Sequence, residues 1–177
     1  MPFLKYFLCL SLPLYVLDQI TKWLIVWNYK EPNLQLHLVD RTEVISGFFE
    51  IVRVHNTGVA FGRFNGEAWA NYVFGAVAFG ALVVIGILWR KGAFPIKTSQ
   101  LAIFLLFPGI LGNLTDRFVH GYVVDFLSFD LGFMVWPSFN VADACICVAA
   151  GLLAISAFLE PRVAKAFCYV SWLLDSP

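Results

Sequence analysis

The chain has 177 residues, of which 60% are hydrophobic and 14% charged, whereas soluble domains usually carry about 25% charged residues. This composition excludes an ordinary soluble enzyme and indicates an integral membrane protein with a single small domain over residues 1–177. The formal net charge of zero, with no basic run, gives no reason to expect a nucleic-acid partner.

Four apolar stretches approach the ~20 residues that a membrane-spanning helix requires. In chain order they cover about residues 3–27, 68–89, 101–120 and 140–159. Pro13 interrupts the first stretch, and Pro108-Gly109 is expected to break the third. No small-x-small cleavage site follows the first stretch, so we interpret it as an uncleaved helix rather than a secretory signal. We therefore predict a mostly α-helical bundle of four transmembrane helices.

The connection between the first two helices, about residues 30–65, has a different pattern. Its runs at 34–39 and 48–54 are alternating or rich in β-branched and aromatic residues, which is typical of short strands. We predict a small β-rich segment that rests on the membrane surface. The residues between Asp125 and Asp143 are interpreted as a hydrophobic linker.

Orientation follows from the basic residues near the helix ends. These are Lys5, Arg90, Lys91, Lys97, Arg162 and Lys165. The 118–139 connection contains no lysine or arginine. Because cytoplasmic loops are enriched in basic residues, both termini and the 90–97 loop are expected in the cytoplasm, and Asp125 at the outer interface.

Two aspartates lie in strongly apolar sequence. Asp125 occurs in Val-Val-Asp-Phe and Asp143 in Phe-Asn-Val-Ala-Asp. A carboxylate in such surroundings is costly, so each needs a functional role or a charged partner. Two carboxylates brought together would titrate jointly and could activate water. Helix capping by Asn140 and helix-dipole compensation by Asp143 provide an alternative explanation for the second.

Further polar residues fall on one face of the third helix. Asn113, Asp116, Arg117 and His120 have the spacing i, i+3, i+4 and i+7, so they should face the bundle interior. We interpret Asp116 and Arg117 as an internal ion pair with a structural role.

The first helix carries Asp18 and Lys22 at i, i+4, which favours a neutralising salt bridge. A serine–lysine peptidase would need a neutral lysine, and the adjacent carboxylate opposes that. Asn56, Thr57 and Gly58 form a turn signal, whose asparagine amide could also hold a substrate backbone. No His-Glu-x-x-His or comparable spacing predicts a metal site, and no cofactor is expected. The four cysteines are interpreted as packing residues without disulfides.

Five motifs occur in order along the chain. They are Asp18-Gln19-Ile20-Thr21-Lys22, Asn56-Thr57-Gly58-Val59-Ala60-Phe61-Gly62, Gly112-Asn113-Leu114-Thr115-Asp116-Arg117, Val123-Val124-Asp125-Phe126 and Phe139-Asn140-Val141-Ala142-Asp143. Together they closely resemble the bacterial lipoprotein signal peptidases, the type II signal peptidases, over about residues 14–155. Gly62 is a mild departure, because the family more often has serine there.

The resemblance implies a membrane aspartyl endopeptidase with four helices and a small extracytoplasmic β-rich cradle. It would remove the signal peptide before a cysteine that carries a diacylglyceryl group. The resemblance assigns the catalytic dyad to Asp125 and Asp143. It assigns substrate-binding or supporting roles to Asn56, Gly58, Asn113, Arg117 and Asn140, and structural roles to Asp18, Lys22 and Asp116.

The partners expected from this resemblance are lipid-modified prolipoproteins, membrane lipids and globomycin-type inhibitors. The protein itself is expected to be a monomer. The expected location is the bacterial inner membrane, with the active site near the outer face. A small transporter is the competing class, but it predicts acidic residues near mid-bilayer and an internal repeat, and the sequence shows neither. A scaffold or chaperone role would leave the two aspartates without a purpose.

Overall fold

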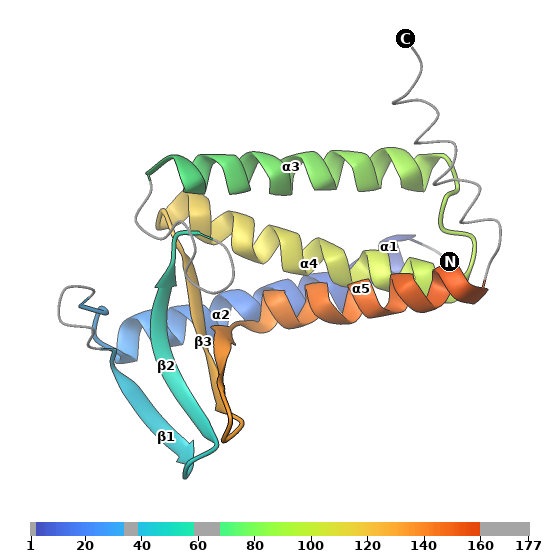
Figure 1. The fold of residues 1–177 in the computed structure, drawn as a ribbon. Helices are drawn as coiled ribbons and strands as arrows, with labels where there is room; N and C mark the ends of the chain where they lie inside the picture. The colour runs from blue at the N-terminus through green and yellow to red at the C-terminus, as the bar shows by residue number, and fades with distance from the viewer. Residues whose placement is uncertain (1–2, 34–38, 59–67, 160–177) are drawn as a thin grey trace.

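The computed structural model describes residues 3–33, 39–58 and 68–159 (Figure 1). Outside the described residues lie most of the strand predicted at 34–39, Gly62, and the segment that carries Arg162 and Lys165.

Four helical spans are long and apolar enough to cross a membrane. The first consists of α1 (Phe3–Tyr6), a π-helical segment (Phe7–Ser11) and α2 (Leu12–Asn28). The others are α3 (Ala68–Arg90), α4 (Lys97–Val119) and α5 (Val141–Leu159). The prediction of four transmembrane helices is confirmed, and their ends lie within a few residues of the predicted ones.

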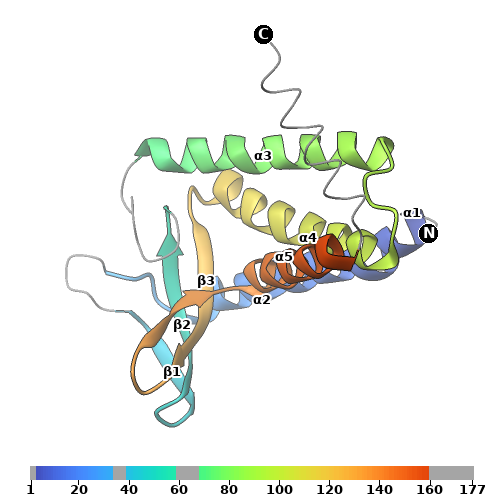
Figure 2. The ribbon, with the colours of Figure 1, turned by 45° about the vertical axis from the view of Figure 1, so that its right-hand side comes forward.

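The helices lie side by side, and α3 packs on the outer side of α4 (Figures 1 and 2). The start of α1, the connection between α3 and α4, and the end of α5 lie at the end of the bundle opposite the sheet (Figure 1). The basic residues Lys5, Arg90 and Lys91 are therefore grouped at that end.

Pro108 does not break the third span, contrary to the prediction. Helix α4 continues through Pro108, whose missing N–H leaves the carbonyl of Phe104 without its helical donor. The buried hydroxyl of Ser11 donates to this carbonyl at 2.7 Å. A side chain from the neighbouring span thus supplies the lost hydrogen bond, which is how proline is tolerated inside membrane helices.

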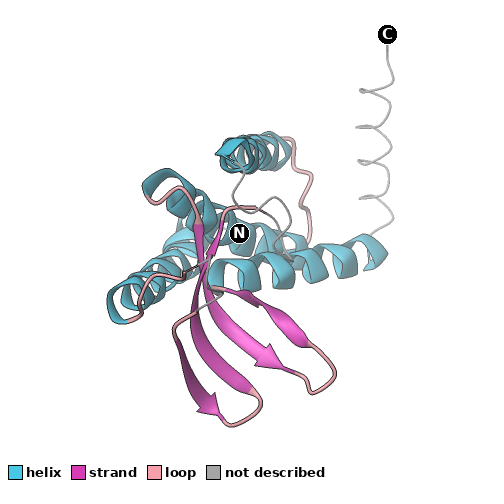
Figure 3. Ribbon diagram, turned by 60° about the vertical axis from the view of Figure 1, so that its left-hand side comes forward, coloured by secondary structure: helices cyan, strands magenta, loops and turns pink. Residues whose placement is uncertain are grey.

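A four-stranded antiparallel sheet projects from one end of the bundle (Figure 3). Its order is β1 (Arg41–Ile45), β2 (Phe49–Asn56), β3 (Val123–Asp130) and β4 (Val135–Phe139). The predicted β-rich segment is confirmed: β2 matches the run predicted at 48–54, whereas β1 is a strand that was not predicted. The hydrophobic-linker interpretation of the residues between Asp125 and Asp143 is wrong, because most of them belong to the β3–β4 hairpin. The start of β3 is buried without interruption and therefore lacks the alternating pattern of a half-exposed strand.

The sheet is attached to the end of α2. Buried Arg53 of β2 donates to the carbonyl oxygens of Val26 at 3.1 Å and Tyr29 at 2.7 Å, where α2 ends and its carbonyls lack helical partners. Val124 and Phe126 of β3 pack on Ile25 of the same helix. These contacts hold β3 against the bundle, next to the start of α5 (Figure 1).

Candidate active site

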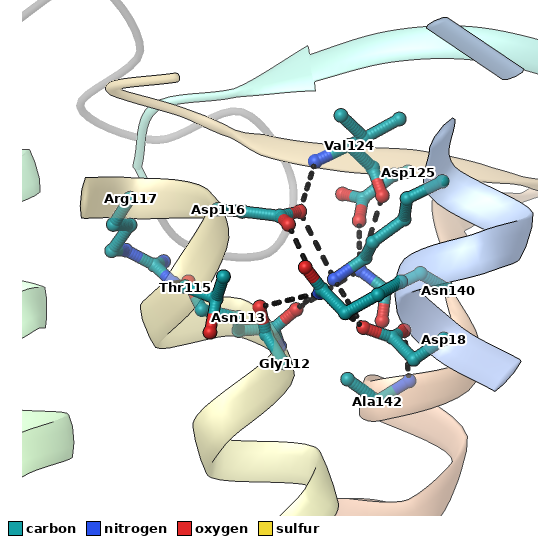
Figure 4. Close-up of polar contacts among 12 residues, drawn as sticks. Asp18, Gly112, Asn113, Thr115, Asp116, Arg117, Val124, Asp125, Asn140 and Ala142 are labelled. Carbon is teal, nitrogen blue, oxygen red and sulfur yellow. Dashed lines mark hydrogen bonds and ion pairs between the residues drawn. The ribbon is translucent and has the colours of Figure 1, made fainter. Parts of the chain in front are cut away.

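Asp125 lies on β3, where its side chain is buried among asparagine amides. The residue is only 2% exposed. Its Oδ1 accepts a hydrogen bond from Nδ2 of Asn140 at 2.7 Å, and its Oδ2 accepts one from Nδ2 of Asn56 at 3.0 Å. The register that pairs Asp125 with Val54 follows a bulge in β2, a feature common next to active sites. The close-up shows Asp125 and Asn140 within one polar cluster (Figure 4).

Asp143 lies in the first turn of α5 and takes part in capping the N-terminus of that helix. Its Oδ1 accepts from Nδ2 of Asn113 at 2.7 Å, and its Oδ2 accepts from the backbone N–H of Asn140 at 3.3 Å. Its own N–H donates to Oδ1 of Asn140 at 2.9 Å. This reciprocal cap confirms that Asn140 caps α5. The same asparagine contacts both Asp125 and Asp143. Asn140 therefore caps α5 and also aligns the two carboxylates.

The electrostatic environment of Asp125 favours its protonated form. Burial is the main cause and the negative charge of Asp143 the second, and together they raise the pKa of Asp125 to about 7. Hydrogen bonds from Asn56 and Asn140 act in the opposite direction. Asp125 is therefore expected to hold a proton near neutral pH.

Lys22, Asp18 and Asp116 form an ion cluster between α2 and α4, next to Asp125 and Asp143. Nζ of Lys22 contacts Oδ2 of Asp18 at 2.9 Å, Oδ2 of Asp116 at 3.0 Å and Oδ1 of Asn113 at 3.0 Å. The predicted Asp18–Lys22 pair is confirmed. The predicted Asp116–Arg117 pair is wrong, because Asp116 turns to Lys22 on the neighbouring helix. A serine–lysine mechanism gains no support, since the three acceptors around Lys22 include no serine.

The two acids of the cluster also bind backbone groups next to the acidic pair. Asp18 Oδ1 accepts from the N–H of Ala142 at 2.8 Å, within the first turn of α5. Asp116 Oδ2 accepts from the N–H of Val124 at 3.0 Å, next to Asp125 on β3 (Figure 4). Each carboxylate thereby fixes the segment that carries one of the two aspartates.

Arg117 points away from the ion cluster, toward α3 and the turn after β2. Its guanidinium donates to the carbonyl oxygens of Asn113 at 3.2 Å and Gly58 at 3.5 Å, and lies 5.8 Å from the ring centre of Phe74. The N–H of Gly58 donates to Oδ1 of Asn56 at 3.1 Å. The turn containing Gly58 is thus connected both to Arg117 and to the asparagine that contacts Asp125.

Two residues were not predicted from the sequence. Gln19 joins the ion cluster, where its Nε2 donates to Asp18 at 3.2 Å, Gly112 O at 3.3 Å and Asp116 at 3.3 Å. Its position next to Asp18 in a membrane helix was the available signal. Tyr122 stacks on His55 with ring centres 3.7 Å apart.

His55 is expected to be neutral. Its Nε2 accepts a hydrogen bond from Arg53 at 3.1 Å. Burial, followed by the charge of Arg53, lowers the pKa of His55 to about 4. Across the described residues, no group of three His, Cys, Asp or Glu side chains is arranged to hold a metal ion.

The four apolar spans and the attached sheet define a multi-pass membrane protein. Two solved structures, both described as bacterial membrane enzymes, are similar to the chain. One has a TM-score of 0.74 and 30% identity, covering 86% of this chain and 87% of its own. The other has a TM-score of 0.71 and 30% identity, covering 88% and 93% respectively.

The sequence comparisons identify the family. Residues 10–159 match the signal peptidase II family. A lipoprotein signal peptidase of Symbiobacterium thermophilum is 41% identical over 149 residues, which cover 83% of this chain and 90% of the relative. One of Vibrio cholerae is 35% identical over 158 residues, which cover 89% of each. The chain belongs to the signal peptidase II family.

Proposed function

We propose that this protein is an aspartyl endopeptidase within the membrane that removes signal peptides from diacylglyceryl-modified prolipoproteins. The observation that carries the proposal is the contact of Asn140 with both Asp125 and Asp143, at 2.7 Å to the first carboxylate and 3.3 Å to the second. The lipoprotein signal peptidases to which the chain is similar support the substrate class. The raised pKa of Asp125 supplies the proton that an acid–base pair needs near neutral pH.

In the proposed mechanism the two carboxyl groups share one proton. The ionised carboxylate takes a proton from a water molecule as the water oxygen bonds to the scissile carbonyl carbon. The protonated carboxyl donates to the carbonyl oxygen, which gives a tetrahedral diol. Collapse of the diol breaks the C–N bond. One diol hydroxyl returns its proton to the ionised carboxylate as the carbonyl re-forms, and the protonated carboxyl donates its proton to the leaving amine. The starting proton is placed on Asp125, whose pKa is raised by burial and by the charge of Asp143.

The amides of Asn56, Asn113 and Asn140 hold the carboxylates in place for these steps. Each donates through its nitrogen to one of the two aspartates, at 3.0, 2.7 and 2.7 Å respectively. Arg117 contacts Gly58, and Gly58 contacts Asn56, which binds Asp125. Arg117 and Gly58 would therefore lie beside a substrate peptide bound at the acidic pair. Fixed donors around a buried acidic pair lower the reorganisation that the reaction requires.

A groove between α3 and α4 provides a place for the substrate's acyl chains. Its volume is about 530 Å³, and it is open to the exterior of the helix bundle. Its lining residues are Asn71, Tyr72, Gly75, Ala76, Phe79, Leu114, Arg117, Phe118 and Gly121. Arg117 at this groove also contacts the turn at Gly58, so a lipid chain here would remain close to the catalytic pair. A substrate anchored in the bilayer would enter laterally.

Filling this groove should weaken binding of lipidated substrate. In Gly75→Leu the new side chain would project toward Leu114, whose Cδ1 lies 4.0 Å from the position that an added β-carbon would take. We expect KM for a diacylglyceryl-modified substrate to rise about tenfold, since an acyl chain buries about 0.8 kcal/mol per CH₂. The matched control is Gly86→Leu on the same helix, where nothing lies within 4 Å of an added β-carbon. Equal KM values for the two variants would exclude the groove as the acyl site.

The pH dependence follows from the raised pKa of Asp125. The reaction requires one proton on the pair, so kcat should fall about tenfold per pH unit above pH 7. A raised carboxyl pKa also stabilises the folded state below the unfolded pKa of about 4, and this contribution is lost as the pH rises to about 7 and beyond. The free energy of unfolding should therefore decline over that range. A flat kcat profile between about pH 6 and 9 would contradict the shared proton.

The proposal is tested by processing of a purified prolipoprotein. Detergent-solubilised protein is mixed with the diacylglyceryl-modified form or the unmodified form, and cleavage is followed by gel shift. We expect cleavage of the modified form only, and its inhibition by globomycin. Absence of cleavage would overturn the proposal, and proton flux through reconstituted vesicles would support the competing transporter.

The same proposal includes location and orientation. The bacterial inner membrane would contain the four helices, with the sheet and catalytic pair at the outer face. The cluster of Lys5, Arg90 and Lys91 at the opposite end supports a cytoplasmic placement of that end. A single chain carries all the proposed catalytic residues, so a monomer would suffice.

A further inference from the structure

We propose that Lys22 is a positioning residue for catalysis, because it fixes the side-chain amide of Asn113 with its nitrogen toward Asp143. The inference rests on the proposed peptidase function. It adds to the charge-neutralising role of the Asp18–Lys22 pair a second role, directed at the catalytic acids through Asn113. Lys22 itself does not contact either of those acids in the hydrogen bonds and ion pairs of the described residues.

The contacts of Lys22 use all its donors. An ammonium group has three N–H donors and no acceptor. Its three partners are oxygens of Asp18, Asp116 and Asn113, at 2.9, 3.0 and 3.0 Å. The lysine is buried, with a side chain only 4% exposed, so water does not replace a missing partner readily. A donor placed opposite Lys22 would therefore be strongly unfavourable.

This constraint determines the orientation of the Asn113 amide. Its Oδ1 faces Lys22 and its Nδ2 donates to Asp143 Oδ1 at 2.7 Å. If the amide were turned over, its N–H groups would face the ammonium and its oxygen would face the carboxylate. Both contacts would then be repulsive in a buried site. Lys22 thus makes Asn113 a dedicated donor to Asp143.

The effect extends to the other aspartate through Asn140. Oδ1 of Asn113 also accepts from Nδ2 of Asn140 at 3.1 Å, and the same Nδ2 donates to Asp125 at 2.7 Å. The N–H of Asp143 fixes Oδ1 of Asn140 from the other side. A chain of oriented amides therefore leads from Lys22 to both catalytic carboxylates.

A simple removal of Lys22 would leave two buried carboxylates unpaired and could prevent folding. The test variant therefore combines Lys22→Met with Asp18→Asn and Asp116→Asn. The two new asparagines retain oxygens for the N–H groups of Ala142 and Val124, which the aspartates now bind. The variant contains no charge in the cluster, so its folding does not depend on a buried ion pair.

Gln19→Met is the matched control. Gln19 belongs to the same cluster and contacts Asp18 and Asp116, but its hydrogen bonds do not include Asn113. A purely structural role for the cluster predicts similar effects of the two variants. The positioning role predicts that only the variant lacking Lys22 changes the chemistry.

The readouts are kcat, KM and the pH profile for a diacylglyceryl-modified prolipoprotein, together with the melting temperature. For the triple variant we expect kcat to fall about 30-fold or more, KM to change less than about threefold, and the alkaline limb to move by about one pH unit. The charged groups around Asn113, Asn140 and the pair are Lys22, Asp18, Asp116, Asp125, Asp143 and Arg117, and the triple variant alters the first three. Gln19→Met should lower the melting temperature while kcat and the limb stay unchanged.

An unchanged kcat and pH limb in a folded triple variant would overturn the positioning role, while leaving the peptidase proposal intact. If the wild-type protein did not cleave the prolipoprotein, the peptidase proposal would be refuted instead. NMR of wild-type protein labelled at asparagine provides a test that needs no variant. The Nδ2 protons of Asn113 should show contacts to Asp143 and none to the Lys22 ammonium. The reverse pattern would also overturn the inference.

Discussion

Replacement of either Asp125 or Asp143 by asparagine is expected to reduce prolipoprotein processing by at least about 100-fold, in line with the ~10²–10⁴-fold contribution of a single acid–base group. Asparagine has nearly the shape of aspartate but cannot take or release the proton. Because Asp125 is only 2% exposed, loss of its charge removes an unfavourable desolvation and should not unfold the protein. Gel-shift rates for each purified variant measure the effect.

The matched control for this pair is Asp130→Asn. Asp130 lies at the exposed end of the same strand as Asp125, and its carboxylate accepts only from the N–H of Gly132, among the hydrogen bonds of the described residues. Its replacement should leave both the rate and the melting temperature unchanged. Retained processing by Asp125→Asn or Asp143→Asn would remove the central assumption of the mechanism, whichever variant retained it.

The second large effect is expected at the contact between α4 and α5. A β-carbon on Gly109 would lie 2.7 Å from the backbone oxygen of Ala142 and 2.6 Å from Cγ1 of Ile146. Backbone atoms cannot move aside easily, so Gly109→Ala should force the helices apart and cost about 1–3 kcal/mol of stability. Since Asn113 and Asp143 lie on these two helices, processing should also decline. Thermal unfolding and the gel-shift assay measure the two effects.

Gly151→Ala provides the control for helix propensity. Gly151 lies on α5, and nothing lies within 4 Å of the position that an added β-carbon would take. There the exchange should stabilise the helix by about 0.5–1 kcal/mol, because alanine has the higher helix propensity. If Gly109→Ala behaved in the same way, the close contact between α4 and α5 would not limit stability.

The helices and the acidic pair could be predicted from the sequence because their signals are local. A run of about 20 apolar residues is sufficient for a membrane span, and a carboxylate inside apolar sequence stands out against its neighbours. The same reasoning found the Asp18–Lys22 pair, whose members are one turn apart. It also identified Asn140 as a cap, which depends only on its position before α5.

The errors concern contacts between distant parts of the chain. The strand β3 was missed because its first residues are buried without alternation, which resembles any apolar segment. Asp116 was paired with its neighbour Arg117, yet its partner Lys22 lies on another helix. Pro108 was expected to break the third span, yet the hydroxyl of Ser11, 93 positions before Phe104, supplies the missing hydrogen bond. Each of these contacts depends on how the helices and strands pack together, which a local sequence pattern does not reveal.

The hydrogen bond from Ala142 to Asp18 spans 124 positions of the chain. During synthesis the first span enters the bilayer long before residue 142 has been made. The Asp18 carboxylate therefore lacks this donor until α5 has been inserted. The segment that carries Asp143 can be fixed by Asp18 only after α5 has been made, so a nascent chain stalled before α5 should be unable to cut a peptide. Such a delay would protect neighbouring membrane proteins from an unfinished protease.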